Sequence, residues 1–149
     1  MSQEEIGSLR VKVRREYLPF YKDLLKRKIF KEHNEFFTFC SCVGKSAPLE
    51  GQQPPLIELC QAYTFKEDQR TVLKTLVYNR KHEVVSINEM FASAEILADN
   101  GFTKLLNSTL QDLVFVNSDG EVSLNPGKER ELQVALSKYV SHKMVEVPF

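Results

Sequence analysis

Three cysteines and one histidine are the residues of this chain whose types suggest site chemistry. Cys40 and Cys42 are separated by one residue, Cys60 follows later, and His33 precedes all three. Thiolates and imidazoles are the usual ligands of a structural zinc ion. A thiol beside a histidine can also form a nucleophilic site. Zinc binding and cysteine catalysis are therefore the two chemical hypotheses to weigh.

The segment that carries the first two cysteines argues against zinc. Apolar residues recur at helical spacing between residues 35 and 44, which predicts a short buried helix that ends at Gly44. On a helix, Cys40 and Cys42 point about 200° apart and cannot bind one ion. In zinc sites, paired cysteine ligands are also usually separated by two to four residues. We therefore expect no metal site, and we interpret the cysteines as small side chains of the core.

The sequence also lacks the motifs of common catalytic sites. It contains no phosphate-binding glycine loop, no G-x-S-x-G elbow and no H-E-x-x-H helix. Cys42 or Cys60 beside His33 has no local sequence signature that supports a nucleophile. We expect a protein that is not an enzyme, with no catalytic residues and no cofactor.

Length and composition indicate one globular domain spanning residues 1–149. The chain is 42% hydrophobic and 27% charged, and its apolar runs are a few residues long. The start resembles no secretory signal, and an odd number of cysteines favours reduced thiols. We expect a cytoplasmic protein without membrane contact. Residues 1–8 are expected to be frayed, and 45–55 to form a proline-rich loop.

The fold class predicted from periodicity is mainly α (α+β), a compact helical domain with one small β-hairpin. Leu9 to Val13 has the alternation of a short strand, whereas Leu56 to Phe65 is either a strand or an irregular buried stretch. Ser86 and Glu89 form a capping box before an apolar stripe. The predicted helices begin near Leu18 and cover 35–44, 67–80, the residues from Ser86 to Asn100-Gly101, 102–113, and the segment opened by Asn125-Pro126, with a hairpin over 113–124.

The charge distribution is strongly asymmetric. The chain has no net charge, yet residues 10–31 contain nine bases and only two acids. Lys26, Arg27 and Lys28 have a structural explanation at a helix C-terminus, and Lys22 and Lys31 are explained by solvation. The bases that remain as candidate contacts to DNA or to an acidic partner are Arg10, Lys12, Arg14 and Arg15. The basic segment can also pair with acidic residues of the same molecule or of a second copy of it.

The order of elements in 67–143 has a winged-helix-like pattern of three helices followed by a hairpin. The segment in the place of the recognition helix offers Lys104, Asn107 and Gln111 for base contacts. The segment in the place of the wing carries Asp119 and Glu121, which a phosphate backbone repels. This favours a winged helix used for packing or dimerisation over one that reads DNA sequence.

Residues 10–113 resemble a family of small bacterial proteins associated with DNA phosphorothioation systems. The matching features are the basic start (Arg10, Lys12, Arg14, Arg15), a helix ending in Lys28-Ile-Phe30, the run Phe37-Thr-Phe-Cys-Ser-Cys-Val-Gly44, Pro48-Leu49, Leu73-Lys-Thr-Leu-Val77, and Ile96-Leu-Ala-Asp-Asn-Gly-Phe102 followed by Leu105. The resemblance implies an accessory role beside bacterial DNA-modification or restriction machinery. It implies no catalytic residues.

Our leading hypothesis is a non-enzymatic accessory or interaction protein of a bacterial DNA-modification or defence system. Its basic N-terminal segment would contact DNA or an acidic protein surface. One alternative is a winged-helix transcriptional regulator that binds DNA through residues 103–111. The other is a protein–protein interaction or dimerisation scaffold, for which a homodimer is one arrangement.

Overall fold

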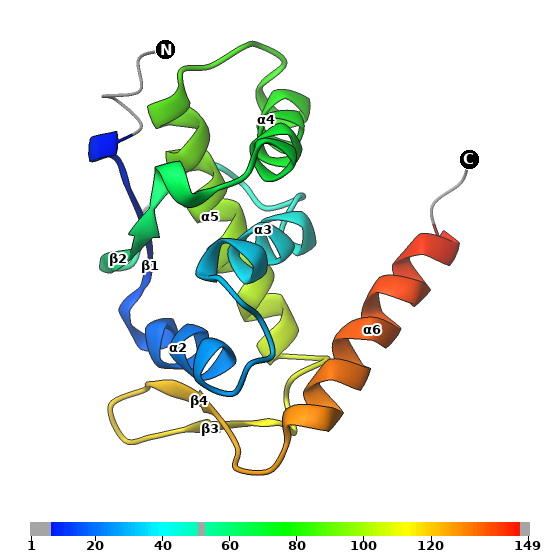
Figure 1. Cartoon of the computed structure of the whole chain (residues 1–149). Coiled ribbons are helices and arrows are strands. Elements are labelled where there is room, and N and C mark those ends of the chain that lie inside the picture. Colours follow the sequence, from blue (N-terminus) through cyan, green and yellow to red (C-terminus); the bar gives the residue numbers. More distant parts are fainter. Residues whose placement is uncertain (1–6, 51–52, 147–149) are drawn as a thin grey trace.

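The computed structural model describes residues 7–50 and 53–146, and it shows a mainly helical protein with a small β component (Figure 1). This confirms the predicted fold class. The helices are α2 (Leu18–Lys26), α3 (His33–Val43), α4 (Glu67–Lys81), α5 (Ile87–Leu106) and α6 (Glu129–Glu146), and the strands pair antiparallel as β1 (Arg10–Arg14) with β2 (Leu56–Gln61) and β3 (Val114–Val116) with β4 (Val122–Leu124). The frayed segment expected at 1–8 lies outside the described residues, apart from Gly7 and Ser8.

Helices α3 and α5 cross with their backbones in contact at two glycines. A Cβ atom added to Gly101 would lie 1.8 Å from the carbonyl oxygen of Cys40. A Cβ atom added to Gly44 would lie 2.0 Å from the carbonyl oxygen of Leu97. Both distances are far below van der Waals contact and involve backbone atoms, so only a residue without a side chain fits at either position.

The close crossing corrects one helix boundary. The helix predicted to end at Asn100-Gly101 continues as α5 to Leu106, because Gly101 serves the contact with α3 and not a left-handed helix end. A separate helix over 102–113 was likewise a wrong prediction, since 107–113 form turns. Two helices, not three, therefore precede the hairpin within 67–143.

The β1–β2 sheet shows how the N-terminal segment is anchored. Val11 and Val13 are buried and Lys12 is exposed, as the alternation predicted. The stretch 56–65, which the sequence left undecided, begins with strand β2. The pairing shifts register between Val11 and Lys12. At this bulge the backbone N–H of Lys12 donates to Oε2 of Glu95 on α5, at 2.8 Å.

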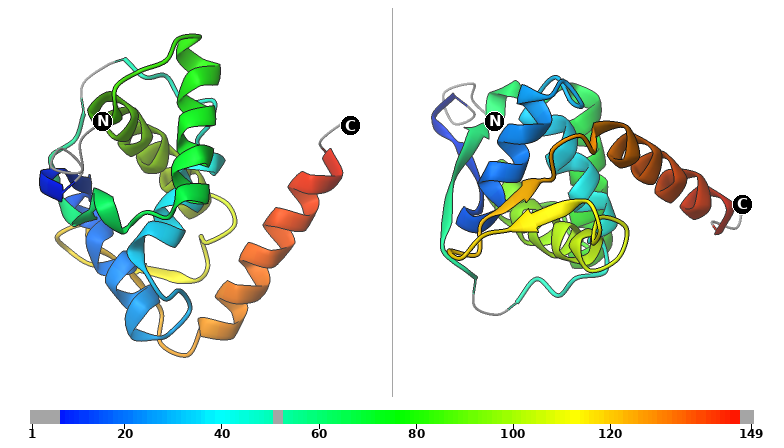
Figure 2. Two further views of the ribbon diagram at one scale, coloured as in Figure 1. Left: turned by 45° about the horizontal axis from the view of Figure 1, so that its top comes forward. Right: turned by 90° about the horizontal axis from the view of Figure 1, so that it is seen from below.

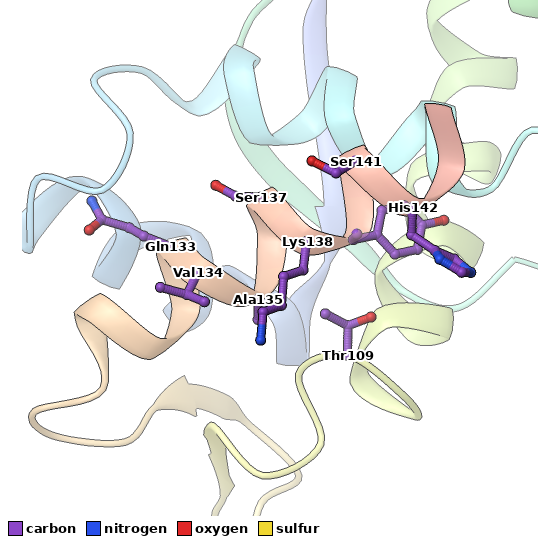
Figure 3. Close-up of a pocket in the computed structure, with 9 residues that line it drawn as sticks. Thr109, Gln133, Val134, Ala135, Ser137, Lys138, Ser141 and His142 are labelled. Carbon is purple, nitrogen blue, oxygen red and sulfur yellow. The ribbon is translucent and has the colours of Figure 1, made fainter. Parts of the chain in front are cut away.

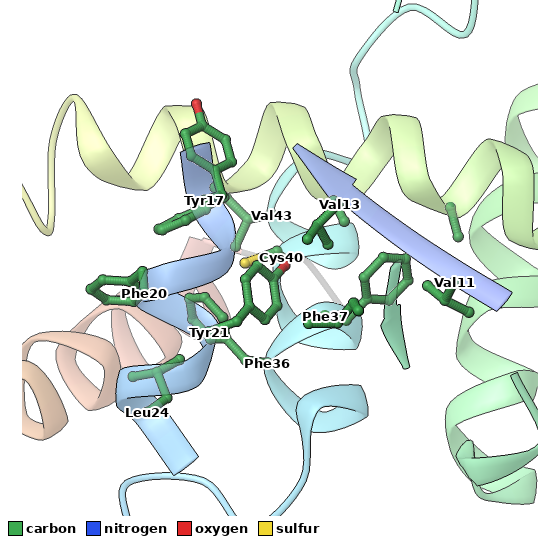
Figure 4. Packing of buried hydrophobic residues seen from close by; sticks show 14 of the residues in the cluster. Val11, Val13, Tyr17, Phe20, Tyr21, Leu24, Phe36, Phe37, Cys40 and Val43 are labelled. Atoms are coloured by element: carbon green, nitrogen blue, oxygen red, sulfur yellow. The ribbon is translucent and has the colours of Figure 1, made fainter. Parts of the chain in front are cut away.

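Aromatic side chains from α2, α3 and α5 meet in the core. The ring centroid of Phe20 lies 5.8 Å from that of Phe36 and 5.0 Å from that of Phe102. Tyr21 lies 5.3 Å from Phe36, and Figure 4 shows both rings between α2 and α3. Each such ring buries about 150–250 Å² on folding, so this cluster fixes α2 across the α3–α5 pair.

Helix α6 is anchored to the body of the protein through its N-terminal part, which includes a contact between the rings of Tyr139 and Phe39. Arg27 at the end of α2 donates to the carbonyl oxygen of Asn125 and to Oε1 of Glu129, both at 3.0 Å. Leu132 and Leu136 pack into the core, and the helix then projects away from the other elements (Figures 1 and 2). None of the helices in the described part of the chain is long and apolar enough to cross a bilayer.

Candidate functional site

Two of the four bases predicted as contact residues form ion pairs within the chain. Nε of Arg10 lies 2.6 Å from Oε1 of Glu58 on the neighbouring strand. Nε and Nη2 of Arg14 donate to the two carboxylate oxygens of Asp99 on α5, at 2.9 and 2.6 Å. A bidentate pair of this kind is among the stronger interactions of an arginine. The guanidinium group of Arg14 is therefore already paired with a carboxylate of the same chain.

Arg14 also belongs to a small network that joins β1 to α5. Its guanidinium carbon lies 4.7 Å from the centre of the Tyr17 ring, and the Tyr17 hydroxyl shares a hydrogen bond with Oγ1 of Thr103. The side chain of Asp99 is only 8% exposed. Burial raises the pKa of Tyr17, so its hydroxyl stays protonated at neutral pH. The network positions structural elements and presents little charge to solvent.

We expect Arg14→Ala to lower the free energy of unfolding by about 2 kcal/mol, because it leaves the nearly buried Asp99 carboxylate without its partner. Arg15 is the matched control, since it is adjacent, exposed and without an ion pair in the described residues. Arg15→Ala should change this free energy by less than about 0.5 kcal/mol. Urea unfolding followed by circular dichroism measures both variants. Equal losses would contradict the structural role of Arg14.

The three residues predicted to read bases do not share a helix. Lys104 lies in the last turn of α5, Asn107 is the C-cap residue, and Gln111 lies in the turns that follow. All three are exposed. A recognition helix must present its contact residues from one continuous face, so this arrangement does not favour the regulator hypothesis.

The exposed bases are instead concentrated on α2 and the turn after it. Lys22, Lys26, Lys28 and Lys31 are exposed and form no ion pair within the described residues. The sequence alone explains these lysines as helix-end or solvated residues and favours the four bases between Arg10 and Arg15 as contacts. Partners of Arg10 and Arg14 were missed because they lie far away in the sequence. Glu58 and Asp99 become visible as partners only once β1 is placed beside β2 and α5.

The cysteines are arranged as inert thiols. Cys40 is buried, Cys42 is exposed and Cys60 is partly buried. Cys40 and Cys42 point in different directions, and the prediction that all three are core side chains is wrong for Cys42. Burial raises the pKa of Cys40 well above its ordinary value and that of Cys60 to about 12. Protonated thiols are poor nucleophiles and poor metal ligands. Among the described residues, no three potential metal ligands come together.

Two grooves open on the surface. One of about 970 Å³ runs along α6 and faces Thr109 (Figure 3). The other, of about 300 Å³, lies beside α4 and is lined by Tyr78, Val84 and Met90, among others. Neither groove is lined by His33 or by a cysteine. The candidate pair of His33 with Cys42 or Cys60 therefore lies outside both grooves.

Comparison of the chain with family models, with curated proteins and with solved structures finds no match. The resemblance to the phosphorothioation-associated family therefore stays a prediction, as do the proposed partners and the homodimer.

Proposed function

We propose that this is a non-enzymatic accessory protein that binds the phosphate backbone of duplex DNA through exposed bases of α2. The observation that carries the proposal is the set of unpaired bases on this helix and its flanking turns. Its members are exposed and form no ion pair within the described residues, and they are Arg15, Lys22, Lys26, Lys28 and Lys31. The sequence resemblance favours DNA as the polyanion and a role beside a bacterial DNA-modification or defence system.

The spacing of these bases supports a single contact surface. Arg15 lies in the 3₁₀ turn Arg15–Tyr17 that leads into α2, and Lys22 and Lys26 follow seven and eleven residues later. Intervals of seven and four residues correspond to about two turns and one turn of helix, so the three side chains lie on one side of the helical segment. Lys28 extends this row at its C-terminal end.

The acids of the same segment face the other way. Oδ2 of Asp23 accepts a hydrogen bond from the backbone N–H of Leu124 in the hairpin, at 3.0 Å. The side chain of Glu16 lies 3.8 Å from a Cβ atom built on Gly120, also in the hairpin. The carboxylate of Asp23 is therefore bound to the hairpin backbone and not to the exposed bases of α2. A net-neutral protein presents one locally positive surface, and such a surface attracts phosphates at short range.

The backbone conformation of Lys28 supports the proposed contact surface independently of the number of bases. Its φ is 61°, the left-handed conformation, at the position after the C-cap residue Arg27 where glycine is preferred. A lysine held there costs about 1 kcal/mol relative to glycine. Lys28→Gly should therefore raise stability by about 1 kcal/mol while removing one basic group.

We expect the wild type to bind a fluorescent random-sequence duplex, with affinity that falls steeply as salt rises. Each phosphate contact contributes about −0.9 to the slope of log K against log salt concentration. Lys22→Glu/Lys26→Glu should weaken binding at least about tenfold and make this slope shallower by about 2. Lys28→Gly should weaken binding about twofold to threefold while its melting temperature rises. Fluorescence anisotropy and thermal unfolding measure the two effects.

Lys74→Glu is the matched control, because Lys74 is an exposed lysine without an ion pair in the described residues and lies on α4. It should leave duplex binding unchanged. The proposal fails if the wild type binds no duplex even at low salt, or if Lys74→Glu weakens binding as much as the α2 variants. A preference among sequences that depends on Asn107 or Gln111 would instead support the regulator.

A further inference from the structure

Helix α6 exposes part of its apolar surface. Among its described side chains, Leu132 and Leu136 are buried and Tyr139 packs beside Phe39, while Val134 and Val140 are 45% and 41% exposed. Short helices are marginally stable in water and depend on packing along an apolar face. A projecting helix with exposed valines is therefore typical of an element that packs against another molecule.

The groove beside α6 is large enough to hold part of a helix. It has a volume of about 970 Å³ and is lined chiefly by Val134, Ala135, Lys138 and Ser141, with Thr109 opposite (Figure 3). A helix about 10 Å wide that rises about 1.5 Å per residue fills about 120 Å³ per residue. The groove thus accommodates about two turns of helix.

The charges on the exposed side of α6 indicate which helix can bind in the groove. Val134 and Lys138 line the groove, and Glu131, three residues before Val134, shares their helix face. Glu131 and Lys138 are exposed, and neither forms an ion pair within the described residues. They are seven residues apart, about 10 Å along the axis, so they cannot pair with each other in one chain.

We propose that the groove is occupied by α6 of a second copy of this chain, in antiparallel orientation. A two-fold axis between Val134 and Ala135 places Glu131 of each copy opposite Lys138 of the other. Two equivalent ion pairs then flank a centre of small apolar side chains. The interface is self-complementary and closes as a two-fold dimer.

The same charges exclude the parallel arrangement. Parallel helices would place Glu131 beside its own copy and Lys138 beside its own copy, which is repulsive at both positions. The antiparallel arrangement also sets the two helix dipoles in opposite directions. Val134 and Ala135 are small enough for the helices to approach closely at the axis.

We expect the full-length wild type to be a monomer at about 1 µM and a dimer at about 100 µM, measured by light scattering after size exclusion. Glu131→Lys and Lys138→Glu each convert two attractive pairs into two repulsive ones. Each single variant should weaken dimerisation about tenfold. The double variant Glu131→Lys/Lys138→Glu restores both pairs with reversed signs and should dimerise as the wild type does.

Mixing the two single variants gives the sharpest test. In a mixed dimer, Lys at position 131 of one copy faces Glu at position 138 of the other, and the second pair is also complementary. Two proteins that dimerise weakly alone should therefore form a mixed dimer, detected by native mass spectrometry. Unfolding of either variant cannot produce this rescue, because rescue requires both α6 helices to be intact.

The proposal is overturned if the wild type stays monomeric at about 1 mM, if neither single variant weakens the dimer, or if mixing restores nothing. A dimer insensitive to these charges would mean that copies meet on another surface. These outcomes are separate from those of the DNA proposal, because the α2 bases lie outside the groove.

Discussion

Gly101→Ala should lower the free energy of unfolding by at least about 3 kcal/mol. The added Cβ would lie 1.8 Å from the carbonyl oxygen of Cys40 and 2.8 Å from the backbone nitrogen of Gly44. Backbone atoms within a packed helix cannot move aside, so α3 and α5 must separate along their crossing. A loss of this size corresponds to a decrease of about 10 °C in melting temperature for a chain of this length.

The direction of the stability change distinguishes a close helix crossing from an ordinary helix interior. In a helix interior without such contact, alanine is about 1 kcal/mol more favourable than glycine. Gly7→Ala is the control, because a Cβ at Gly7 meets no atom within 4 Å. Differential scanning calorimetry on Gly101→Ala, Gly44→Ala and Gly7→Ala compares the three. A melting temperature for Gly101→Ala at or above that of the wild type would refute the close crossing.

Gly101 also shows what a single sequence can and cannot predict. Apolar periodicity located most helices, and the capping box at Ser86 marks the start of α5, where Ser86 Oγ accepts from the backbone N–H of Glu89. A glycine after an apolar stripe has two physical meanings, a left-handed helix end or a close approach to another backbone. The sequence alone favours a left-handed helix end at Gly101, whereas the structure shows a close approach to another backbone. Only the position of α3 distinguishes the two.

The candidate contact surface was predicted less completely, for a related reason. Counting charges located the basic segment 10–31, but the count does not say which bases have acidic partners. Arg14 and Asp99 are 85 residues apart in the chain, and their pairing depends on β1 packing against α5. Glu95 and Asp99 already lie one turn apart on the helix predicted from Ser86 to Asn100-Gly101, but periodicity does not indicate that β1 is the neighbour they both contact.

Arg27 connects the two surfaces for which we propose functions. It is the C-cap residue of α2, and it holds the start of α6 through the carbonyl oxygens of Leu124 and Asn125 and the carboxylate of Glu129. The row of exposed bases and helix α6 are thus tied together at one residue. A dimer through α6 would present two such rows in fixed orientation, which increases the effective concentration of the second row once the first has bound.

The stability of the protein should decrease as pH rises from about 4.5 to about 7, by about 3 kcal/mol from Glu95 alone. Burial raises the pKa of Glu95 from an ordinary 4.5 to about 7, while the hydrogen bond from the Lys12 backbone N–H opposes the shift only in part. Between these two pH values the folded state binds more protons than the unfolded state. Protonation thus favours folding, and this contribution is complete below about pH 4.5 and lost above about pH 7.

Glu95→Gln should abolish this pH dependence, because glutamine keeps an oxygen that accepts from Lys12 and carries no charge to bury. His33 contributes with the opposite sign, since burial disfavours its charged form and lowers its pKa. Subtracting the Glu95→Gln profile from that of the wild type cancels His33, which both proteins contain. Urea unfolding at several pH values gives the two profiles, with Glu50→Gln as an exposed control. Parallel profiles for wild type and Glu95→Gln would show that the carboxylate is solvated, and the bulge at Lys12 would then need another hydrogen-bond acceptor.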